Sequence, residues 1–404
     1  MKSLLAATFL SITVSCFPPS LLADDWPRWR GPSLDGISKE SNWRAEWPDS
    51  DPPLVWKTNV GTGLSGISIA NKKVYTIGNT DNVDTVYCFD ADSGKEIWSH
   101  SYPAALDPKY YEGGPGSTPT VEGDTVFTIS REGHVFSLDA ANGSVRWSTH
   151  LVADLGFPAP TWGFNGSPLV LGERVFLNAG TSGVALDKAS GTVIWKSAAD
   201  EAGYSSPYPI ERDGTSQLVF SSTRSFSGVN PDSGKAAWSF PWLTRYGVNA
   251  ADPVAVDADT LFISSGYGKG AALIRLSGAE PEVIWKVKEM GNQMNPSLLI
   301  NGFLYGVNGN EDGDPEFQCL DSSSGEIKWS DDSTGMSGAI AANGYLIILG
   351  ERGELILAPA SPESFDPVTR IQILGGKSWT APSLANGRVY CRNIRGDLVC
   401  VDLR

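Results

Sequence analysis

The chain has 404 residues, a formal net charge of −15, and many glycines, prolines and tryptophans. Such an acidic chain is repelled by nucleic-acid backbones and by anionic membrane surfaces, so we expect neither as a partner. The five cysteines and three histidines are spread along the sequence, without the close spacing typical of zinc ligands, so we predict no metal site.

The first 23 residues have the features of a secretory signal. Lys2 comes before an apolar stretch from Leu4 to Val14, and Ala23 supplies the small residue that precedes a cleavage site. We therefore expect a signal peptide at 1–23 and an exported protein, periplasmic or secreted. Lipidation of Cys16 is the weaker alternative, because Thr13-Val14-Ser15 matches a lipoprotein site poorly. We expect no transmembrane span in the rest of the chain.

One short pattern then recurs about every 40 to 50 residues. Its fullest copy runs from Val86 to Trp98: an apolar strand ending at Asp90, two variable residues, Ser93-Gly94, three variable residues and a tryptophan. The aspartate can accept hydrogen bonds from backbone amides of the turn, and the glycine supplies the positive φ that the turn needs. A large ring at one fixed place per repeat suits the gap between neighbouring sheets. We expect this structural role for Trp56, Trp98, Trp147, Trp195, Trp238, Trp285 and Trp329.

A second feature precedes each copy of the pattern. A pair such as Thr118-Pro119 or Ser167-Pro168 begins an inner strand, which leads into a β-rich run. Each repeat therefore holds four strands, and we count eight repeats. This predicts an all-β fold, an eight-bladed β-propeller over residues 51–404, with residues 24–50 packed on it as an N-terminal segment.

The two ends of the propeller are expected to meet in one blade. The last repeat stops at Arg404, before its outer strand. An unassigned strand at Leu54-Val55-Trp56-Lys57 comes before the first inner strand. If this strand completes the eighth sheet, the ring is closed and no sheet edge is left open between the ends.

The cysteines divide into two groups. Cys88, Cys319 and Cys400 occupy the same repeat position, where a small side chain packs between sheets. Cys391 and Cys400 lie on the two arms of the final hairpin, and they face each other if Arg395-Gly396 are its central turn residues. Because export permits disulfides, we predict a bond between Cys391 and Cys400, with the other two cysteines free.

The Asp-x-x-Ser-Gly-x-x-x-Trp repeat resembles the repeat of the pyrroloquinoline-quinone-like (PQQ-like) propellers, over roughly residues 50 to 404. That family includes quinoprotein alcohol dehydrogenases and the lipoprotein of the bacterial outer-membrane β-barrel assembly machine. A closer likeness to exported bacterial single-propeller proteins lies in a few short stretches. These are Trp26 to Pro32 with Asp35-Gly36, Trp162-Gly163-Phe164, and Gly203 to Pro207. The resemblance implies the fold more firmly than an activity.

The resemblance to the dehydrogenases would imply PQQ in the central channel, under a disulfide of adjacent cysteines, with calcium near a catalytic aspartate. This sequence has no Cys-Cys pair and no Cys-x-x-Cys-His haem motif. Asp252, at the start of an inner strand, could face the channel, but a turn or strand cap is the simpler interpretation. We therefore expect no catalytic residues and no cofactor; PQQ with calcium belongs to the alternative below.

The loops from each outer tryptophan to the next inner strand are expected to gather at one mouth of the channel. Several carry aromatic and amide side chains, a mixture that suits a sugar, a peptide strand or a flat cofactor. The candidate ligand-binding residues are Tyr111, Trp162, Tyr204, Tyr246, Asn249, Gln293, Asn295 and Trp379. The alternative is that these loops only cover the channel.

Together these features favour an exported, monomeric propeller that acts as a non-catalytic binding or scaffold module, with a place in envelope protein assembly. Its partner would be a protein or peptide. A small PQQ-dependent alcohol or sugar dehydrogenase is one alternative, and a carbohydrate-binding propeller is another. The missing cysteine pair and haem motif count against the dehydrogenase, whereas nothing in the sequence separates a protein partner from a carbohydrate.

Overall fold

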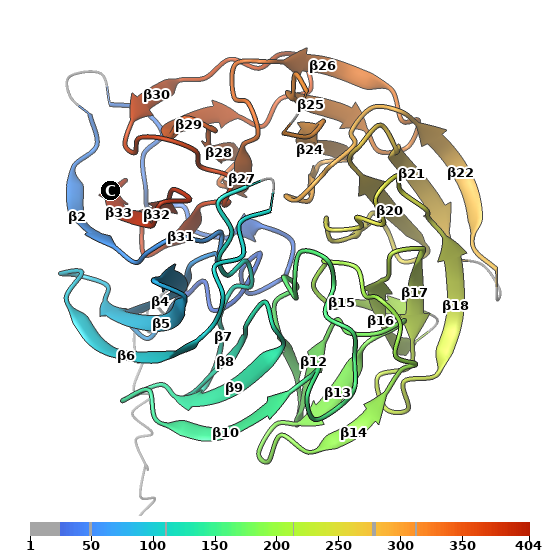
Figure 1. The fold of residues 1–404 in the computed structure, drawn as a ribbon. Helices are drawn as coiled ribbons and strands as arrows, with labels where there is room; N and C mark the ends of the chain where they lie inside the picture. The colour runs from blue at the N-terminus through green and yellow to red at the C-terminus, as the bar shows by residue number, and fades with distance from the viewer. Residues whose placement is uncertain (1–24, 48–50, 110, 213, 277–279, 312) are drawn as a thin grey trace, which may run out of the picture.

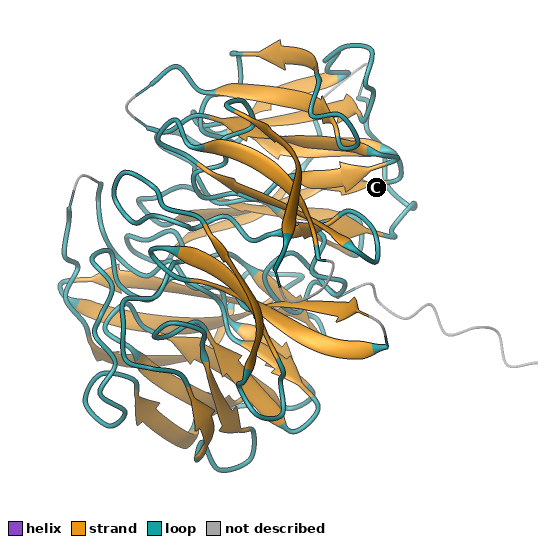
Figure 2. Cartoon of the chain, turned by 90° about the vertical axis from the view of Figure 1, so that its right-hand side faces the viewer, coloured by secondary structure: helices purple, strands orange, loops and turns teal. Residues whose placement is uncertain are grey.

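The computed structural model describes residues 25–47, 51–109, 111–212, 214–276, 280–311 and 313–404. The expected signal peptide and Cys16 lie outside these residues. In the described part of the chain all regular structure is strand, with loops at both ends of the sheets (Figure 2). Accordingly, these residues include no helix long and apolar enough to cross a membrane.

Eight sheets are arranged as blades around one axis (Figure 1), which confirms the predicted eight-bladed propeller. Blade 1 holds β3 (Ser68–Ala70), β4 (Lys73–Thr80), β5 (Val83–Asp90) and β6 (Glu96–Pro103). Blade 2 holds β7 (Thr120–Glu122), β8 (Thr125–Ile129), β9 (His134–Asp139) and β10 (Val145–His150). Blade 3 holds β11 (Leu169–Leu171), β12 (Arg174–Leu177), β13 (Val184–Asp187) and β14 (Val193–Lys196). Blade 4 holds β15 (Tyr208–Arg212), β16 (Thr215–Ser221), β17 (Ser225–Val229) and β18 (Ala236–Pro241).

The second half of the ring repeats this order. Blade 5 holds β19 (Val254–Ala255), β20 (Thr260–Ser265), β21 (Gly270–Arg275) and β22 (Glu282–Val287). Blade 6 holds β23 (Leu298–Ile300), β24 (Phe303–Asn308), β25 (Glu316–Asp321) and β26 (Ile327–Asp331). Blade 7 holds β1 (Ile37–Ser38), β27 (Gly338–Ala342), β28 (Tyr345–Leu349), β29 (Glu354–Pro359) and β30 (Thr369–Gln372). Blade 8 holds β31 (Ser383–Ala385), β32 (Arg388–Arg392), β33 (Asp397–Asp402) and β2 (Leu54–Asn59).

Blade 8 closes the ring as predicted. Its outer strand β2 pairs antiparallel with β33, the last strand of the chain (Figure 1). In this pairing Trp56 lies opposite Cys400. The Trp56 side chain is buried, and its indole Nε1 donates to the carbonyl oxygen of Ala91 in blade 1 at 2.9 Å. The beginning and the end of the propeller are therefore joined in one sheet, which then packs on the first blade.

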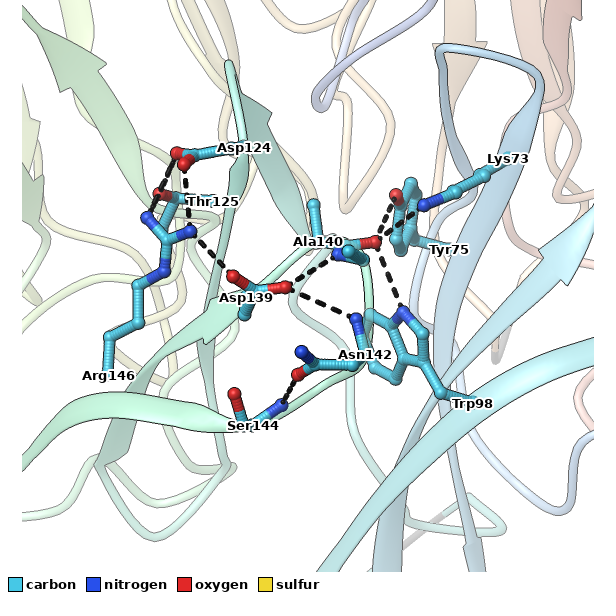
Figure 3. Close-up of polar contacts among 11 residues, drawn as sticks. Lys73, Tyr75, Trp98, Asp124, Thr125, Asp139, Ala140, Asn142, Ser144 and Arg146 are labelled. Atoms are coloured by element: carbon cyan, nitrogen blue, oxygen red, sulfur yellow. Dashed lines mark hydrogen bonds and ion pairs between the residues drawn. The ribbon is translucent and has the colours of Figure 1, made fainter.

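The repeated turn and tryptophan form the contact between neighbouring blades (Figure 3). In blade 2, Asp139 Oδ1 accepts hydrogen bonds from the backbone amides of Ala141 and Asn142, at 2.9 and 3.2 Å. Trp98 of blade 1 lies over this turn and donates from Nε1 to the Ala140 carbonyl oxygen at 3.2 Å. Gly143 has φ of 74°, and a Cβ there would lie 2.5 Å from the Trp98 ring. The glycine is therefore required by the turn and by the ring above it.

The same indole-to-carbonyl contact joins most other neighbouring blades. It links Trp147 to Lys188, Trp195 to Pro231, Trp285 to Ser322 and Trp329 to Ser361. Trp238 is different, because its Nε1 donates to Gln217 Oε1 of its own blade at 2.8 Å. The copy of the turn that should receive Trp238 is the degraded one before Trp285, and residues 277–279 of it lie outside the described residues.

The predicted disulfide is wrong. In the final hairpin Asn393 and Asp397 close the turn, with a 3.0 Å bond from the Asn393 amide to the Asp397 carbonyl oxygen. This turn is one residue longer than expected, so Cys391 lies opposite Val399, and Cys400 lies opposite Tyr390. Neighbouring positions along a strand project to opposite faces, so the two thiols point away from each other. All four described cysteines, Cys88, Cys319, Cys391 and Cys400, are free and buried.

Candidate functional site

A cavity of about 540 Å³ lies in the mouth of the central channel. Its upper wall comes from the loops that connect one blade to the next. Its lower wall comes from the residues that begin the inner strands, Thr118, Ser167, Ser206, Asp252 and Thr380. Seven of the eight predicted ligand-binding residues line it, namely Tyr111, Trp162, Tyr204, Tyr246, Gln293, Asn295 and Trp379.

Contacts between loops hold the aromatic rings of this cavity in place. Trp162 and Tyr204 meet edge to face with ring centroids 5.9 Å apart, and Tyr246 meets Tyr267 in the same way at 5.1 Å. Asn295 Nδ2 donates to the backbone carbonyl oxygen of Trp379 at 2.8 Å. The rings come from different blades, so the site depends on the closed ring and not on one local segment.

Asn249 is the predicted site residue that does not belong to the cavity. Its side chain is fully buried, and its Nδ2 donates to the carbonyl oxygens of Ser222 and Trp242 at 2.8 and 3.0 Å. Its Oδ1 accepts from Ser265 Oγ at 2.8 Å. All of its polar atoms are therefore used inside the protein, and its role is to hold the loop between blades 4 and 5.

The N-terminal segment, residues 25–47, crosses the middle of the ring (Figure 1, blue) and contacts inner strands of many blades in succession. Trp26 forms a β-bridge with Ile69 of blade 1. The carbonyl oxygen of Pro27 accepts from the Val121 amide of blade 2 at 2.8 Å. Farther along, β1 pairs in parallel with β27, so blade 7 has a fifth strand on its axial side.

Trp29 of this segment is the floor of the cavity. The Trp29 side chain borders the large cavity on one side and a second, small cavity of about 20 Å³ on the other. Its Nε1 donates to Asp252 Oδ2 at 2.7 Å. Sequence reasoning did not include Trp29 in the site, because the contact joins residues more than two hundred positions apart. The signal for a role of Trp29 was that the segment from Trp26 to Pro32 is similar to segments of other exported propellers.

Asp252 is buried in this floor. Its Oδ1 accepts from the Ser206 amide at 2.7 Å, so each of its oxygens has a donor. Burial raises the pKa of Asp252 to about 6, an effect that the Arg30 guanidinium and the two hydrogen bonds partly offset. Arg30 is itself buried and donates to the carbonyl oxygens of Leu34 and Ser297 at 2.9 and 3.2 Å.

The residues that line the cavity do not fit a calcium ion bound together with a quinone. A calcium site needs several oxygen ligands with lone pairs available, commonly carboxylates. Only two carboxylates, Asp252 and Glu311, are among the described residues that line the cavity, and both oxygens of Asp252 already accept hydrogen bonds from Trp29 and Ser206. Within the described ranges, no group of three or more His, Cys, Asp or Glu residues could hold a metal ion.

The three histidines, far apart in sequence, come together between blades 1 and 2. The His134 and His150 rings are stacked with centroids 5.4 Å apart, and the His100 ring is 4.9 Å from that of Phe136. Phe136 in turn lies 4.1 Å from His134. The sequence carries a signal for this cluster, because His100 and His150 follow the repeat tryptophans Trp98 and Trp147 of adjacent blades at nearly the same distance.

Comparison with known proteins identifies the family of this chain. The family model described as outer membrane protein assembly factor BamB matches residues 49–152 and 82–331. The protein of that name from Yersinia pestis is 23% identical over 357 residues, covering 83% of this chain and 84% of that protein. The one from Escherichia coli (strain K12) is 30% identical over 114 residues, 26% of this chain and 27% of that protein. The tetrathionate hydrolase of Acidithiobacillus ferrooxidans is 23% identical over 244 residues, 60% of this chain and 42% of that protein.

Two of the solved structures that share the fold are of different kinds of protein. BamB from Moraxella catarrhalis superposes with a TM-score of 0.64 at 14% identity, over 87% of this chain and all of that one. A europium-containing methanol dehydrogenase superposes with a TM-score of 0.69 at 14% identity, over 93% of this chain and 89% of that one. These likenesses establish the propeller, whereas the family follows from the sequence match over more than half of the chain. The chain belongs to the family described as outer membrane protein assembly factor BamB.

Proposed function

We propose that this protein is an exported, non-catalytic binding module that acts in envelope protein assembly and holds a segment of a partner protein at the mouth of its ring. Membership of the BamB family and the relatives named as outer membrane assembly factors support the process. The cavity supports the mode of action. Aromatic faces with a few amide groups suit an extended peptide, whose backbone bonds to amides while its side chains pack on rings.

The observation that carries this proposal is the floor of the cavity. Trp29 closes the channel below the aromatic rim, and the buried carboxylate beside it is already bonded to two donors. An enzyme of the quinone type needs a cation to polarise a carbonyl and a base to take a proton. The floor therefore favours binding over chemistry, although dehydrogenases and a hydrolase are among the proteins with this fold or repeat.

Site-specific photo-crosslinking in cells tests the proposal. A photoreactive amino acid replaces Tyr246, which is 52% exposed at the rim, and in a control it replaces the exposed Lys95 on a distant turn. The expected result is a crosslink from position 246, and not from position 95, to an identified protein of outer-membrane assembly. A rim that gives no protein crosslink, together with calorimetric binding of neutral oligosaccharides by the purified protein, would replace this proposal by carbohydrate binding.

A further inference from the structure

Five cationic residues belong to blade 4, blade 5 and the loop between them. We call them the basic patch: Arg224, Arg245, Lys269, Lys286 and Lys288. In Figure 1 the two blades are neighbours, with strands β15–β18 and β19–β22. A cluster of like charge carries an electrostatic cost, and it is the opposite of what a net charge of −15 would lead one to expect.

Contacts around Trp242 bring the three lysines of the patch together and place the Arg224 backbone beside them. The Lys269 and Lys286 ammonium groups lie 4.4 and 5.1 Å from the centroid of the Trp242 ring. Lys288 Nζ donates to the carbonyl oxygen of Gly268, next to Lys269, at 2.9 Å. The carbonyl oxygen of Arg224 accepts from the Trp242 backbone amide at 2.7 Å.

The patch reaches the rim of the cavity through two tyrosines. The Arg245 guanidinium lies 5.2 Å from the centroid of the Tyr246 ring. Tyr246 meets Tyr267, which is two positions from Lys269, and both tyrosines line the cavity. A ligand bound on the patch would therefore touch the mouth of the channel.

The charges of the patch are not neutralised within the described residues. None of the five cations forms an ion pair there, whereas Arg146, for example, bonds to both Asp124 and Asp139. Glu289 is adjacent in sequence, but its carboxylate accepts from the backbone amide of Lys288. Burial, and then the repulsion of Lys286 and Lys288, lower the pKa of Lys269, as expected of neighbouring cations without an anion between them.

Exposed apolar side chains accompany these charges. Leu243 is 57% exposed and Tyr246 is 52% exposed, and both belong to the same loop between blades 4 and 5. Apolar side chains with a border of unneutralised cations are typical of a protein interface, in which hydrophobic contacts give affinity and charges select the partner.

We propose that the basic patch docks an acidic segment of a partner protein, with an apolar side chain of that segment against Leu243 and its continuation entering the cavity past Tyr246. This inference rests on the proposed function and names the chemistry of its partner. Charge complementarity selects a peptide over an anionic membrane. An anionic membrane is a broad surface, so the net negative charge of the whole protein repels it. A narrow peptide lies within one screening length of the patch, about 8 Å, so it interacts mainly with the five cations.

Fluorescence anisotropy with the full chain tests this docking. The probe is a labelled peptide rich in glutamate that contains leucine, and the reference probe has glutamine in place of every glutamate. The variant Lys269→Gln/Lys286→Gln removes two charges of the patch, and Lys57→Gln/Lys95→Gln removes two exposed charges elsewhere. We expect the first variant to weaken binding of the acidic peptide about tenfold and the control to leave it unchanged, with affinity falling as salt rises.

Two results would overturn the proposal: an acidic peptide that binds no better than its glutamine reference, or equal binding by the patch variant. If Lys269→Gln/Lys286→Gln lowers the melting temperature, Arg245→Gln/Lys288→Gln repeats the test, because these side chains do not contact Trp242. Vesicles with phosphatidylglycerol form a separate arm, and patch-dependent binding to them would assign the surface to the membrane instead. If the peptide assay shows no docking on the basic patch but position 246 still crosslinks to a protein of outer-membrane assembly, this inference fails and the proposed function stands.

Discussion

The indole Nε1 of Trp29 donates a 2.7 Å hydrogen bond to Oδ2 of Asp252, and this contact fastens the N-terminal segment to blade 5 across the central channel. The segment crosses the ring (Figure 1), and the cavity lies between Trp29 and the loops that connect the blades. A ligand that enters from the loop side meets Trp29 at the bottom. The floor is therefore part of the site as well as part of the fold.

Replacing Trp29 by phenylalanine tests the importance of this bond. Trp29→Phe keeps a ring but leaves one buried oxygen of Asp252 without its donor, so we expect a loss of about 1–3 kcal/mol in the free energy of unfolding. Trp47→Phe is the matched control, because the Trp47 Nε1 is buried and has no hydrogen-bond partner among the described residues. Denaturant titration measures both. Equal stability losses in the two variants would contradict the assigned role of the Trp29–Asp252 bond.

The contact between blades predicts a graded series at Trp98. Trp98→Ala removes a buried ring and should cost about 3–5 kcal/mol, whereas Trp98→Phe should cost about 1 kcal/mol, mainly the bond to Ala140. Thermal and denaturant unfolding measure the series.

The glycine below this ring gives an independent test of the same contact. Gly143→Ala should destabilise more than Gly123→Ala. Both glycines have positive φ, 74° and 60°, but a Cβ at 143 would meet the Trp98 ring at 2.5 Å, whereas a Cβ at 123 has nothing within 4 Å. Equal costs for the two glycine variants would show that the ring does not press on the turn.

The histidine cluster predicts a pH dependence of stability. Burial lowers the pKa of His100, and burial with repulsion from His150 lowers the pKa of His134. Below about pH 6.5 the unfolded chain therefore binds more protons at these positions than the folded chain, so their contribution to stability is present at neutral pH and is lost as the pH falls.

Other groups act in the opposite direction, so a variant is needed to isolate the histidines. Burial raises the pKa of Asp84 and Asp252 to about 6, which favours the folded state as the pH falls through that value. The double variant His100→Gln/His134→Gln removes only the histidine contribution. Unfolding at pH 7.5 and pH 5 should show a smaller loss of stability for the variant than for the wild type. An identical loss would mean that the cluster titrates normally in the fold.

The cavity predicts an absence of quinone-dependent turnover. Purified protein mixed with the quinone, calcium, an artificial electron acceptor and a panel of alcohols and aldoses should give no more product than the protein-free control. The physical reason is that the described lining of the cavity offers only two carboxylates, Asp252 and Glu311, whereas calcium needs several oxygen ligands. Both oxygens of Asp252 also already accept hydrogen bonds. Turnover that disappears on chelation would promote the oxidoreductase alternative.

The parts of the structure that sequence predicted well are those governed by local chemistry. Each repeat has an aspartate, a glycine and a tryptophan with one fixed role each, as Asp139, Gly143 and Trp98 show. The spacing of these residues predicted the blades, the number of blades and the closing strand at Trp56. Residues on the connecting loops could be placed at the channel mouth for the same reason.

The failures come from register and from contacts between distant segments. One extra turn residue moved Cys391 to the opposite face from Cys400. Asn249 turned inward because Ser222 and Trp242 offered carbonyl oxygens. The pairing of Trp29 with Asp252 depends on how a free segment crosses the ring, which no local pattern describes.

The most direct test of the central claim is the amount of folded outer-membrane β-barrel protein in cells that lack this protein. Folded barrels are measured by their heat-modifiable migration in gels, in the deletion strain and after complementation with wild type, Lys95→Gln or Trp162→Ala. We predict a reduced level in the deletion strain that wild type and Lys95→Gln restore and Trp162→Ala, stable but altered at the cavity, does not. An unchanged level of folded barrels in the deletion strain would contradict a role in envelope protein assembly.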